Sequence, residues 1–319
     1  MSARRHCSNS SPANTRQRSP ELKIGITDSG VGGLSVCAEL ETRLRESPIE
    51  ADLEILYLNA AIEDDYAYNS MPDRETKLLA FNRFLTSVVQ RYELDLLFIA
   101  CNTLSVLYQD PYFDHHRHIP IKGIVDTGVQ EMRAVFKKQP DTTNLVFATP
   151  TTIKEGVYGK RLRQHGVPPG QVIEQACPGL PDAISNDGSG QLARQLLEQF
   201  VPAALKQTQT PPESVVAFLG CTHYGYQARQ FEQVLLPLVP NVKVLNPNRA
   251  AVDTILSMLN PITTGNGSLD IHFITRYEIP GIVMQSLSGY IGSQAPRTLS
   301  ALQNFTLLPE LCGDLKSIT

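Results

Sequence analysis

Short continuous apolar runs recur along the chain, and each is followed by a longer stretch with helical spacing of its apolar residues. Apolar runs without polar alternation are typical of strands that are buried on both faces of a parallel sheet. The alternation predicts βαβ units and an α/β fold, with parallel-rich sheets flanked by helices. The predicted strands are 23–27, 53–58, 96–100, 121–125, 145–149, 172–176, 215–219, 242–245 and 269–274, and the predicted helices are 34–45, 73–92, 127–138, 151–165, 191–207, 227–236, 249–259 and 281–291.

Two of the apolar runs end on a cysteine. The segment DLLFIACNTLSVLY (95–108) contains Cys101, the segment SVVAFLGCTHYGY (214–226) contains Cys221, and a polar residue able to cap a helix follows each cysteine. Parallel sheets of α/β proteins bind ligands beyond the carboxyl ends of their strands, so both thiols are predicted at ligand-binding positions. A single buried cysteine is more often a packing residue. The repeated context instead favours paired acid and base chemistry, in which a thiolate takes a proton and a thiol returns one.

Length and composition narrow the class of protein. A chain of 319 residues predicts two domains. The net charge of −4 and the lack of a basic stripe with interleaved aromatic residues argue against a nucleic-acid partner. Six cysteines without paired spacing indicate a reducing cytoplasm. No apolar run is long enough to cross a bilayer, so we expect a soluble cytoplasmic protein with no membrane partner.

Residues 1–21 are rich in Ser, Arg, Asn and Pro and have no apolar periodicity. This composition predicts a disordered tail. Arg and Ser with little acid are also typical of organelle transit peptides, but the tail has no amphipathic face to support that interpretation.

Two further motifs resemble cofactor sites, one for a dinucleotide and one for a metal, but neither fits the expected pattern. The loop DSGVGG (28–33) follows the first predicted strand, but it lacks the third spaced glycine of a dinucleotide fingerprint, and Asp28 would repel a pyrophosphate. Asp28 is instead expected to bind an ammonium group or to shift the pKa of a nearby base. Alternatively, it caps the turn. The turn DHHRH (114–118) lacks a carboxylate or cysteine ligand at standard spacing, so no metal is predicted.

Three motifs in order, IGITDSGVGGLSV (24–36), ACNT (100–103) and LGCTHY (219–224), resemble those of the glutamate racemases. This family belongs to the cofactor-independent aspartate/glutamate racemase superfamily. The segment ATPTTIKEGVY (148–158) and the pair Cys177-Pro178 fit the same resemblance. The match covers roughly residues 23–250, and the three ordered motifs are specific to the superfamily.

The resemblance implies two pseudo-symmetric α/β domains with the active site in the cleft between them. By analogy, the first domain is discontinuous, with residues 22–120 plus 247–319, and the second domain is 121–246. The family acts on a small amino acid without a cofactor and without a metal. Dimers are common in the superfamily, which makes a homodimer one expected assembly. The implied activity is racemisation of glutamate, as a supply of D-amino acid for peptidoglycan.

Carried over motif by motif, the resemblance identifies Cys101 and Cys221 as the two catalytic cysteines. One would remove the α-proton and the other would reprotonate the opposite face. The residues expected to contact substrate or assist the thiols are Asp28, Ser29, Asn102, Thr103, Thr222 and His223. His223 could exchange a proton with Cys221, and Asp28 could assist Cys101. Helix N-termini after both cysteines are expected to supply donors and to favour thiolate.

The sequence departs from the family pattern in its loops. Where the family has Pro-Tyr-Gly, this chain has YAYNS (66–70), and PDAIS (181–185) follows the Cys-Pro pair without the usual glutamate. Gly225 replaces a proline, and Asp126 stands where many members have glutamate. Both cysteine motifs are intact. The altered loops leave aspartate or another amino acid as an alternative substrate, and a non-catalytic amino-acid-binding protein or a redox dithiol as alternatives of other classes.

Overall fold

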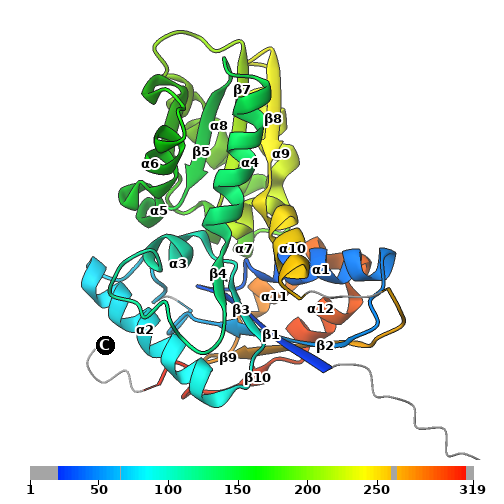
Figure 1. Ribbon diagram of the computed structural model, residues 1–319. Helices are drawn as coiled ribbons and strands as arrows, with labels where there is room; N and C mark the ends of the chain where they lie inside the picture. The colour runs from blue at the N-terminus through cyan, green and yellow to red at the C-terminus, as the bar shows by residue number, and fades with distance from the viewer. Residues whose placement is uncertain (1–20, 65, 260–263, 314–319) are drawn as a thin grey trace, which may run out of the picture.

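The computed structural model describes residues 21–64, 66–259 and 264–313, and it contains two parallel sheets (Figure 1). The predicted disordered tail, apart from Glu21, lies outside the described residues. The larger sheet has the order β10-β9-β2-β1-β3-β4, with β10 Thr306–Leu307, β9 Leu269–Thr275, β2 Asp52–Asn59, β1 Glu21–Asp28, β3 Leu96–Ile99 and β4 Ile121–Gly123. The smaller sheet has the order β6-β5-β7-β8, with β6 Val172–Ala176, β5 Thr143–Ala148, β7 Ser214–Gly220 and β8 Asn241–Leu245.

The smaller sheet repeats the strand order of part of the larger one. The order β6-β5-β7-β8 corresponds to β2-β1-β3-β4, and every strand pair in both sheets is parallel. The predicted fold class, an α/β protein with two similar parallel-rich halves, is therefore confirmed. In Figure 1 the smaller sheet and its helices form an upper unit that stands on the larger one.

Helices connect the strands and flank both sheets. The α-helices are α1 Leu34–Glu46, α2 Arg74–Arg91, α3 Asn102–Leu107, α4 Ile124–Lys138, α5 Pro150–Glu155, α6 Val157–Gln164, α7 Leu180–Asn186, α8 Gln191–Leu205, α9 Ala228–Leu235, α10 Pro247–Met258, α11 Gly281–Ile291 and α12 Pro296–Gln303. The 3-10 helices are η1 Pro169–Gln171, η2 Thr222–Gln227 and η3 Gly292–Gln294. None of the helices in the described ranges is long and apolar enough to cross a membrane.

Several predicted boundaries were wrong. The predicted helix 151–165 is divided into α5 and α6 because Gly156 has a φ of +61°, a left-handed conformation that ends α5. The predicted strand 121–125 ends at Gly123, and α4 begins at once. Strand β4 pairs with β3 in the larger sheet. Helices α7 and α12 were not predicted.

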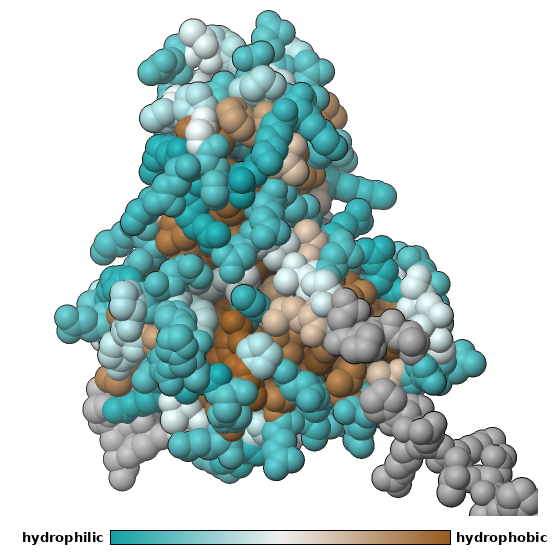
Figure 2. Space-filling model, viewed as in Figure 1, coloured by the Kyte–Doolittle hydropathy of each residue, from teal (hydrophilic) through white to brown (hydrophobic). Residues whose placement is uncertain are grey.

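Burial of both faces of each sheet explains the continuous apolar runs. In the larger sheet, Ile24 and Ile26 belong to one apolar cluster, whereas Leu97 and Ile99 pack into a different one on the opposite face. The smaller sheet likewise separates two clusters. Each fully buried Leu, Ile or Phe stabilises the fold by about 1.5–3 kcal/mol. On the face seen in Figure 2, hydrophilic side chains cover most of the surface.

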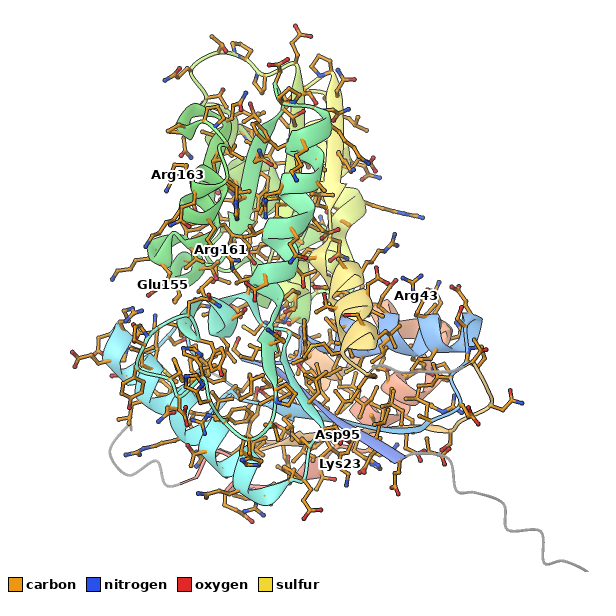
Figure 3. The ribbon with its side chains drawn as sticks, in the orientation of Figure 1. Lys23, Arg43, Asp95, Glu155, Arg161 and Arg163 are labelled. Atoms are coloured by element: carbon orange, nitrogen blue, oxygen red, sulfur yellow. The ribbon has the colours of Figure 1, made fainter. Side chains whose placement is uncertain are left out.

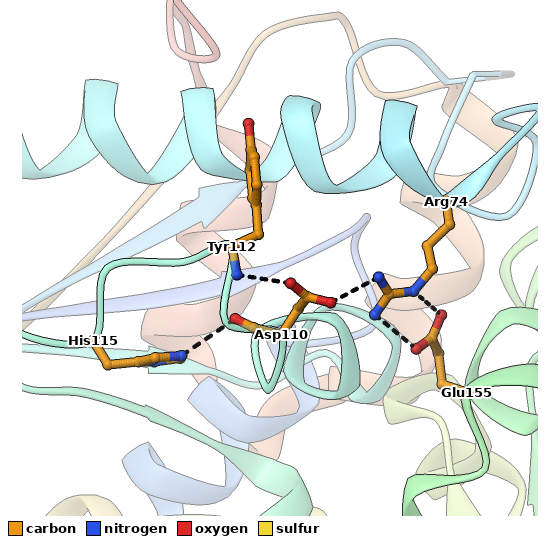
Figure 4. Close-up of polar contacts among 5 residues, drawn as sticks. All are labelled: Arg74, Asp110, Tyr112, His115 and Glu155. Carbon is orange, nitrogen blue, oxygen red and sulfur yellow. Dashed lines mark hydrogen bonds and ion pairs between the residues drawn. The ribbon is translucent and has the colours of Figure 1, made fainter.

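An arginine on α2 joins the two units. The guanidinium of Arg74 binds both carboxylate oxygens of Glu155 on α5, at 2.9 and 3.1 Å, and it also donates to Asp110 at 2.7 Å (Figure 4). Lys77, one turn further along α2, donates to the hydroxyl of Thr151 at 2.9 Å. Two-point binding of a carboxylate by arginine is stronger than a single exposed ion pair.

We therefore expect Arg74→Met to lower the free energy of unfolding by about 1 kcal/mol, with a smaller loss at high salt because exposed charges are screened. Urea unfolding at low and high salt measures this. Arg43→Met is the matched control, because Arg43 pairs with Asp253 through side chains that are 45% and 63% exposed, and it lies far from Glu155 in Figure 3. Equal losses for both variants would contradict a special role for the Arg74 contact.

Candidate active site

A cavity of about 500 Å³ lies where the carboxyl ends of the two sheets meet. Its walls come from the loops after β1, β2, β3 and β9 of the larger sheet, from the loops after β5, β6 and β7 of the smaller sheet, and from α11. This is the position at which parallel sheets bind ligands. All eight residues predicted from the sequence line it: Asp28, Ser29, Cys101, Asn102, Thr103, Cys221, Thr222 and His223.

Strand pairing places Ser29 beside Cys101. Strands β1 and β3 pair with Thr27 opposite Ile99, so the residues two positions further along each chain also lie side by side. The Ser29 Oγ and the Cys101 Sγ are 3.1 Å apart and share a hydrogen bond. Cys101 is also the N-cap of α3, and its sulfur accepts a hydrogen bond from the backbone N–H of Leu104 at 3.4 Å. A helix N-terminus therefore contacts this thiol, as predicted.

Cys221 stands at the corresponding position of the smaller sheet, after β7, but its surroundings differ. The segment after it is the 3-10 helix η2 rather than an α-helix, and the Cys221 side chain accepts no capping hydrogen bond there. A helix therefore begins after each cysteine, as predicted, but of the two only Cys101 accepts a capping hydrogen bond at its sulfur. The partner of this thiol is the imidazole of His223, whose Nδ1 is 3.7 Å from the sulfur.

The loop after β1 is pressed against the Cys221 segment. Thr222 Oγ1 donates to Asp28 Oδ2 at 2.9 Å, a buried hydrogen bond between the two units. Asn248 on α10 donates to the carbonyl oxygen of Thr222 at 3.1 Å. A Cβ atom on Gly32 would lie 2.3 Å from His223 Nδ1, so only glycine allows this close approach. Asp28 thus contacts the Cys221 segment rather than Cys101, which we had expected it to assist.

Asn102 and Thr103, at the start of α3, contact the smaller unit. The hydroxyl of Tyr158 on α6 donates to Oδ1 of Asn102. The hydroxyl of Thr103 shares hydrogen bonds with those of Thr149, at 2.9 Å, and Thr152, at 3.2 Å. Every one of these side chains is buried. Both units therefore hold the residues that follow Cys101.

The thiols are weaker acids than we predicted. Burial, followed by the negative charge of Asp28, raises the pKa of Cys101 to about 12, against smaller opposing effects of the hydrogen bonds from Ser29 and Leu104. Burial and the same Asp28 charge raise the pKa of Cys221 well above its ordinary value. Removal from water outweighs the helix N-terminus. A thiol with a raised pKa gives less thiolate, but that thiolate is a stronger base.

Asp28 and His223, which also line the cavity, have pKa values shifted in the directions that favour their neutral forms. Burial raises the pKa of Asp28 to about 6, although hydrogen bonds from Thr222 and from the backbone oppose the change. Burial lowers the pKa of His223 to about 4. At neutral pH the imidazole is therefore uncharged, with one nitrogen able to accept a proton.

We expect Asp28→Asn to stabilise the protein at high pH. The folded state holds the Asp28 proton more tightly than the unfolded chain does, so this contribution to stability is present below about pH 4 and is lost as the pH rises through about 6. One pKa unit corresponds to about 1.4 kcal/mol, so the ionised carboxylate costs about 3 kcal/mol. Asparagine cannot ionise and still accepts the hydrogen bond from Thr222, so a gain of about 1–3 kcal/mol is expected at pH 8. Urea unfolding at pH 4, 6 and 8 measures the gain, and a gain that is equal at all three would contradict burial of the charge as its cause.

The cavity has further walls that the sequence interpretation missed. Asp182 on α7 lines it, and burial, followed by the charge of Asp64, raises the pKa of the Asp182 carboxyl. The sequence signal was the segment 181–185, whose departure from the family pattern leaves the choice of substrate open but does not single out Asp182. Tyr277 and Val283 reach the cavity from distant sequence and carried no signal. Within the described ranges, no group of three or more His, Cys, Asp or Glu residues is arranged to hold a metal ion.

Comparison with known proteins agrees with this geometry. Residues 24–255 match the model of the Asp/Glu/Hydantoin racemase family. The chain belongs to this racemase family. A glutamate racemase of Aquifex pyrophilus is 28% identical over 255 residues, which are 79% of this chain and 88% of that protein. A glutamate racemase of Campylobacter jejuni is 28% identical over 265 residues, 82% of this chain and 95% of that protein.

A solved structure of a family member has the same fold. The glutamate racemase isoform from Bacillus anthracis superposes with a TM-score of 0.68 at 22% identity, covering 90% of this chain and 98% of that chain. The family resemblance seen in the three sequence motifs is thus confirmed. Membership in a family of racemases makes this protein an isomerase.

Proposed function

We propose that this protein is a glutamate racemase that works without a cofactor, with Cys101 and Cys221 as its two bases. The observation that carries the proposal is that two cysteines follow corresponding strands, β3 and β7, of two similar sheets and line one cavity. Racemisation must remove and return a proton on opposite faces of one carbon. Two groups supplied by two separate units are a direct way to reach both faces.

In the proposed reaction, one cysteine is a thiolate and the other a thiol. The thiolate removes the α-hydrogen as a proton and becomes a thiol, while the other thiol gives its proton to the opposite face and becomes a thiolate. The His223 imidazole contacts the Cys221 sulfur and exchanges a proton with it. The Ser29 hydroxyl shares a hydrogen bond with the Cys101 sulfur and is the corresponding partner of that thiol. After one turnover the two cysteines have exchanged protonation states.

Asp28 is proposed to receive the ammonium group of the substrate. Its carboxylate is buried, lines the cavity and raises the pKa of both thiols. A bound ammonium would neutralise this charge, so the pKa of each thiol would fall when substrate binds. Asn102 and Thr103 would donate to the carboxylate oxygens, which take up negative charge as the α-proton leaves. Thr222 would do so through its backbone N–H, because its hydroxyl already donates to Asp28. Substrate binding would thus help to form the thiolate that acts on it.

Glutamate is the proposed substrate because the similar proteins are named glutamate racemases. Aspartate is the alternative within the same chemistry, since the segments 66–70 and 181–185 depart from the family pattern. We further propose that the two units are domains, 22–120 plus 247–319 and 121–246. Strand β4 then belongs to the second domain by sequence but pairs with β3 of the first. A cytoplasmic homodimer that supplies D-glutamate for peptidoglycan is the biological setting we propose.

The test is the loss of α-hydrogen in deuterated water from L- and D-glutamate and from L- and D-aspartate, without added cofactor. We expect the wild type to exchange the α-hydrogen of glutamate and to racemise it. Faster turnover of aspartate than of glutamate would show that aspartate is the preferred substrate. If neither acid exchanges although one binds tightly, the protein is a non-catalytic amino-acid-binding protein. Formation of a Cys101–Cys221 disulfide in mild oxidant would instead favour a redox dithiol.

A further inference from the structure

A hydrogen bond between the two units holds the side-chain amide of Asn102. Asn102 directly follows Cys101, lines the cavity and is 1% exposed. The hydroxyl of Tyr158, on α6 of the smaller unit, donates to its Oδ1. Its Nδ2 is buried and has no hydrogen-bond partner among the described residues. The Oδ1 atom of the amide therefore accepts a hydrogen bond from the protein, whereas its Nδ2 group has hydrogen-bond donors that are not used by the described residues.

Tyr158 is held rigidly. Its side chain is fully buried, and its ring packs against that of Phe218 with the centroids 4.9 Å apart. Gly128 on α4 lies so close that a Cβ atom there would approach a Tyr158 ring carbon to 3.2 Å. Burial keeps the pKa of the phenol far above its ordinary value, so the hydroxyl remains protonated and can donate. Because the hydroxyl occupies Oδ1, the amide is oriented with Nδ2 on the other side.

We propose that Tyr158 is a positioning residue for the racemase reaction: its hydroxyl orients the amide of Asn102 so that Nδ2 donates to a carboxylate oxygen of the bound amino acid. A buried amide N–H without a partner is unfavourable, and a substrate carboxylate supplies the acceptor that is missing. This inference rests on the proposed function, because it needs an amino acid in the cavity.

The role has a kinetic signature. When the α-proton leaves, the negative charge on the α-carbon spreads onto the carboxylate oxygens. A hydrogen bond from Nδ2 is therefore stronger in the transition state than in the bound substrate, and its loss lowers kcat more than it raises KM. Replacing a residue that only supports the fold would lower the stability of the protein without lowering kcat more than it raises KM.

Tyr158→Phe keeps the ring and removes the hydroxyl. We expect kcat for glutamate to fall about ten- to a hundredfold in both directions, with KM changed by less than about threefold. Tyr224→Phe is the matched control. Tyr224 is also fully buried in the smaller unit, but its hydroxyl donates to the backbone oxygen of Cys177 at 3.4 Å, and neither Tyr224 nor Cys177 is among the residues that line the cavity. Its kcat should stay within about threefold of wild type.

A double-mutant cycle with Asn102→Ala decides whether Tyr158 acts through Asn102. Once the amide is gone, Tyr158→Phe should cost less than about twofold in kcat, because there is nothing left to orient. Independent, multiplicative losses would overturn the inference, as would a Tyr158→Phe variant with wild-type kcat. A wild type that fails to racemise either acid would contradict the proposed function and this inference together, whereas an active wild type with independent losses contradicts the inference alone.

Discussion

Replacing either Cys101 or Cys221 with serine is expected to lower racemisation of glutamate at least about a thousandfold. A serine hydroxyl is a far weaker acid than a thiol and is scarcely ionised at neutral pH, so a general acid or base worth about 10²–10⁴-fold is lost. The two variants should differ in a revealing way. Each retains one thiol, which can still remove a proton from the enantiomer whose α-hydrogen faces it and return a deuteron to the same face.

Proton NMR in deuterated water distinguishes these outcomes. Cys101→Ser should exchange one enantiomer of glutamate without inverting it, and Cys221→Ser should exchange the opposite enantiomer. Cys312→Ser is the matched control, because Cys312 is also a buried free thiol but does not line the cavity. Its racemisation rate should remain close to wild type. Exchange of the same enantiomer by both serine variants would contradict a mechanism with one base on each face.

Gly32→Ala is expected to lower kcat about a hundredfold while leaving the protein folded. The new Cβ atom would lie 2.3 Å from His223 Nδ1 and 2.5 Å from Thr222 Oγ1, closer than non-bonded atoms can approach. Either the loop or the His223 ring must move, which separates His223 from Cys221 and Thr222 from Asp28. Displacements of about 1 Å in catalytic groups can cost about 10²-fold in rate. Steady-state kinetics measure the loss, and thermal unfolding verifies the fold.

Gly30→Ala is the comparison in the same loop. No atom lies within 4 Å of a Cβ atom at Gly30, and its backbone does not have a positive φ. Its loss of kcat should be at least tenfold smaller than that of Gly32→Ala, although Gly30 also lines the cavity. Similar losses in the two variants would show that the contact with His223 and Thr222 is unimportant.

The sequence pattern predicted most of the sheet strands, because a strand buried on both faces must be apolar at every position. The strands that precede Cys101 and Cys221 are examples, and their inner residues divide between clusters on opposite faces of each sheet. Errors arose where local conformation departs from periodicity. Gly156 ends a helix that the apolar pattern would continue, and the predicted strand 121–125 ends at Gly123, where α4 begins.

The sequence by itself determined the α/β class and the placement of both cysteines at the ends of strands, because these depend on local hydrophobic patterning. Only the tertiary structure decided which groups touch them. The pairing of β1 with β3 places Ser29 at Cys101, and contact between the units places Thr222 at Asp28 and Tyr158 at Asn102. The pKa values of the thiols are also tertiary properties, since desolvation by distant segments outweighs the local helix N-terminus that the sequence reveals.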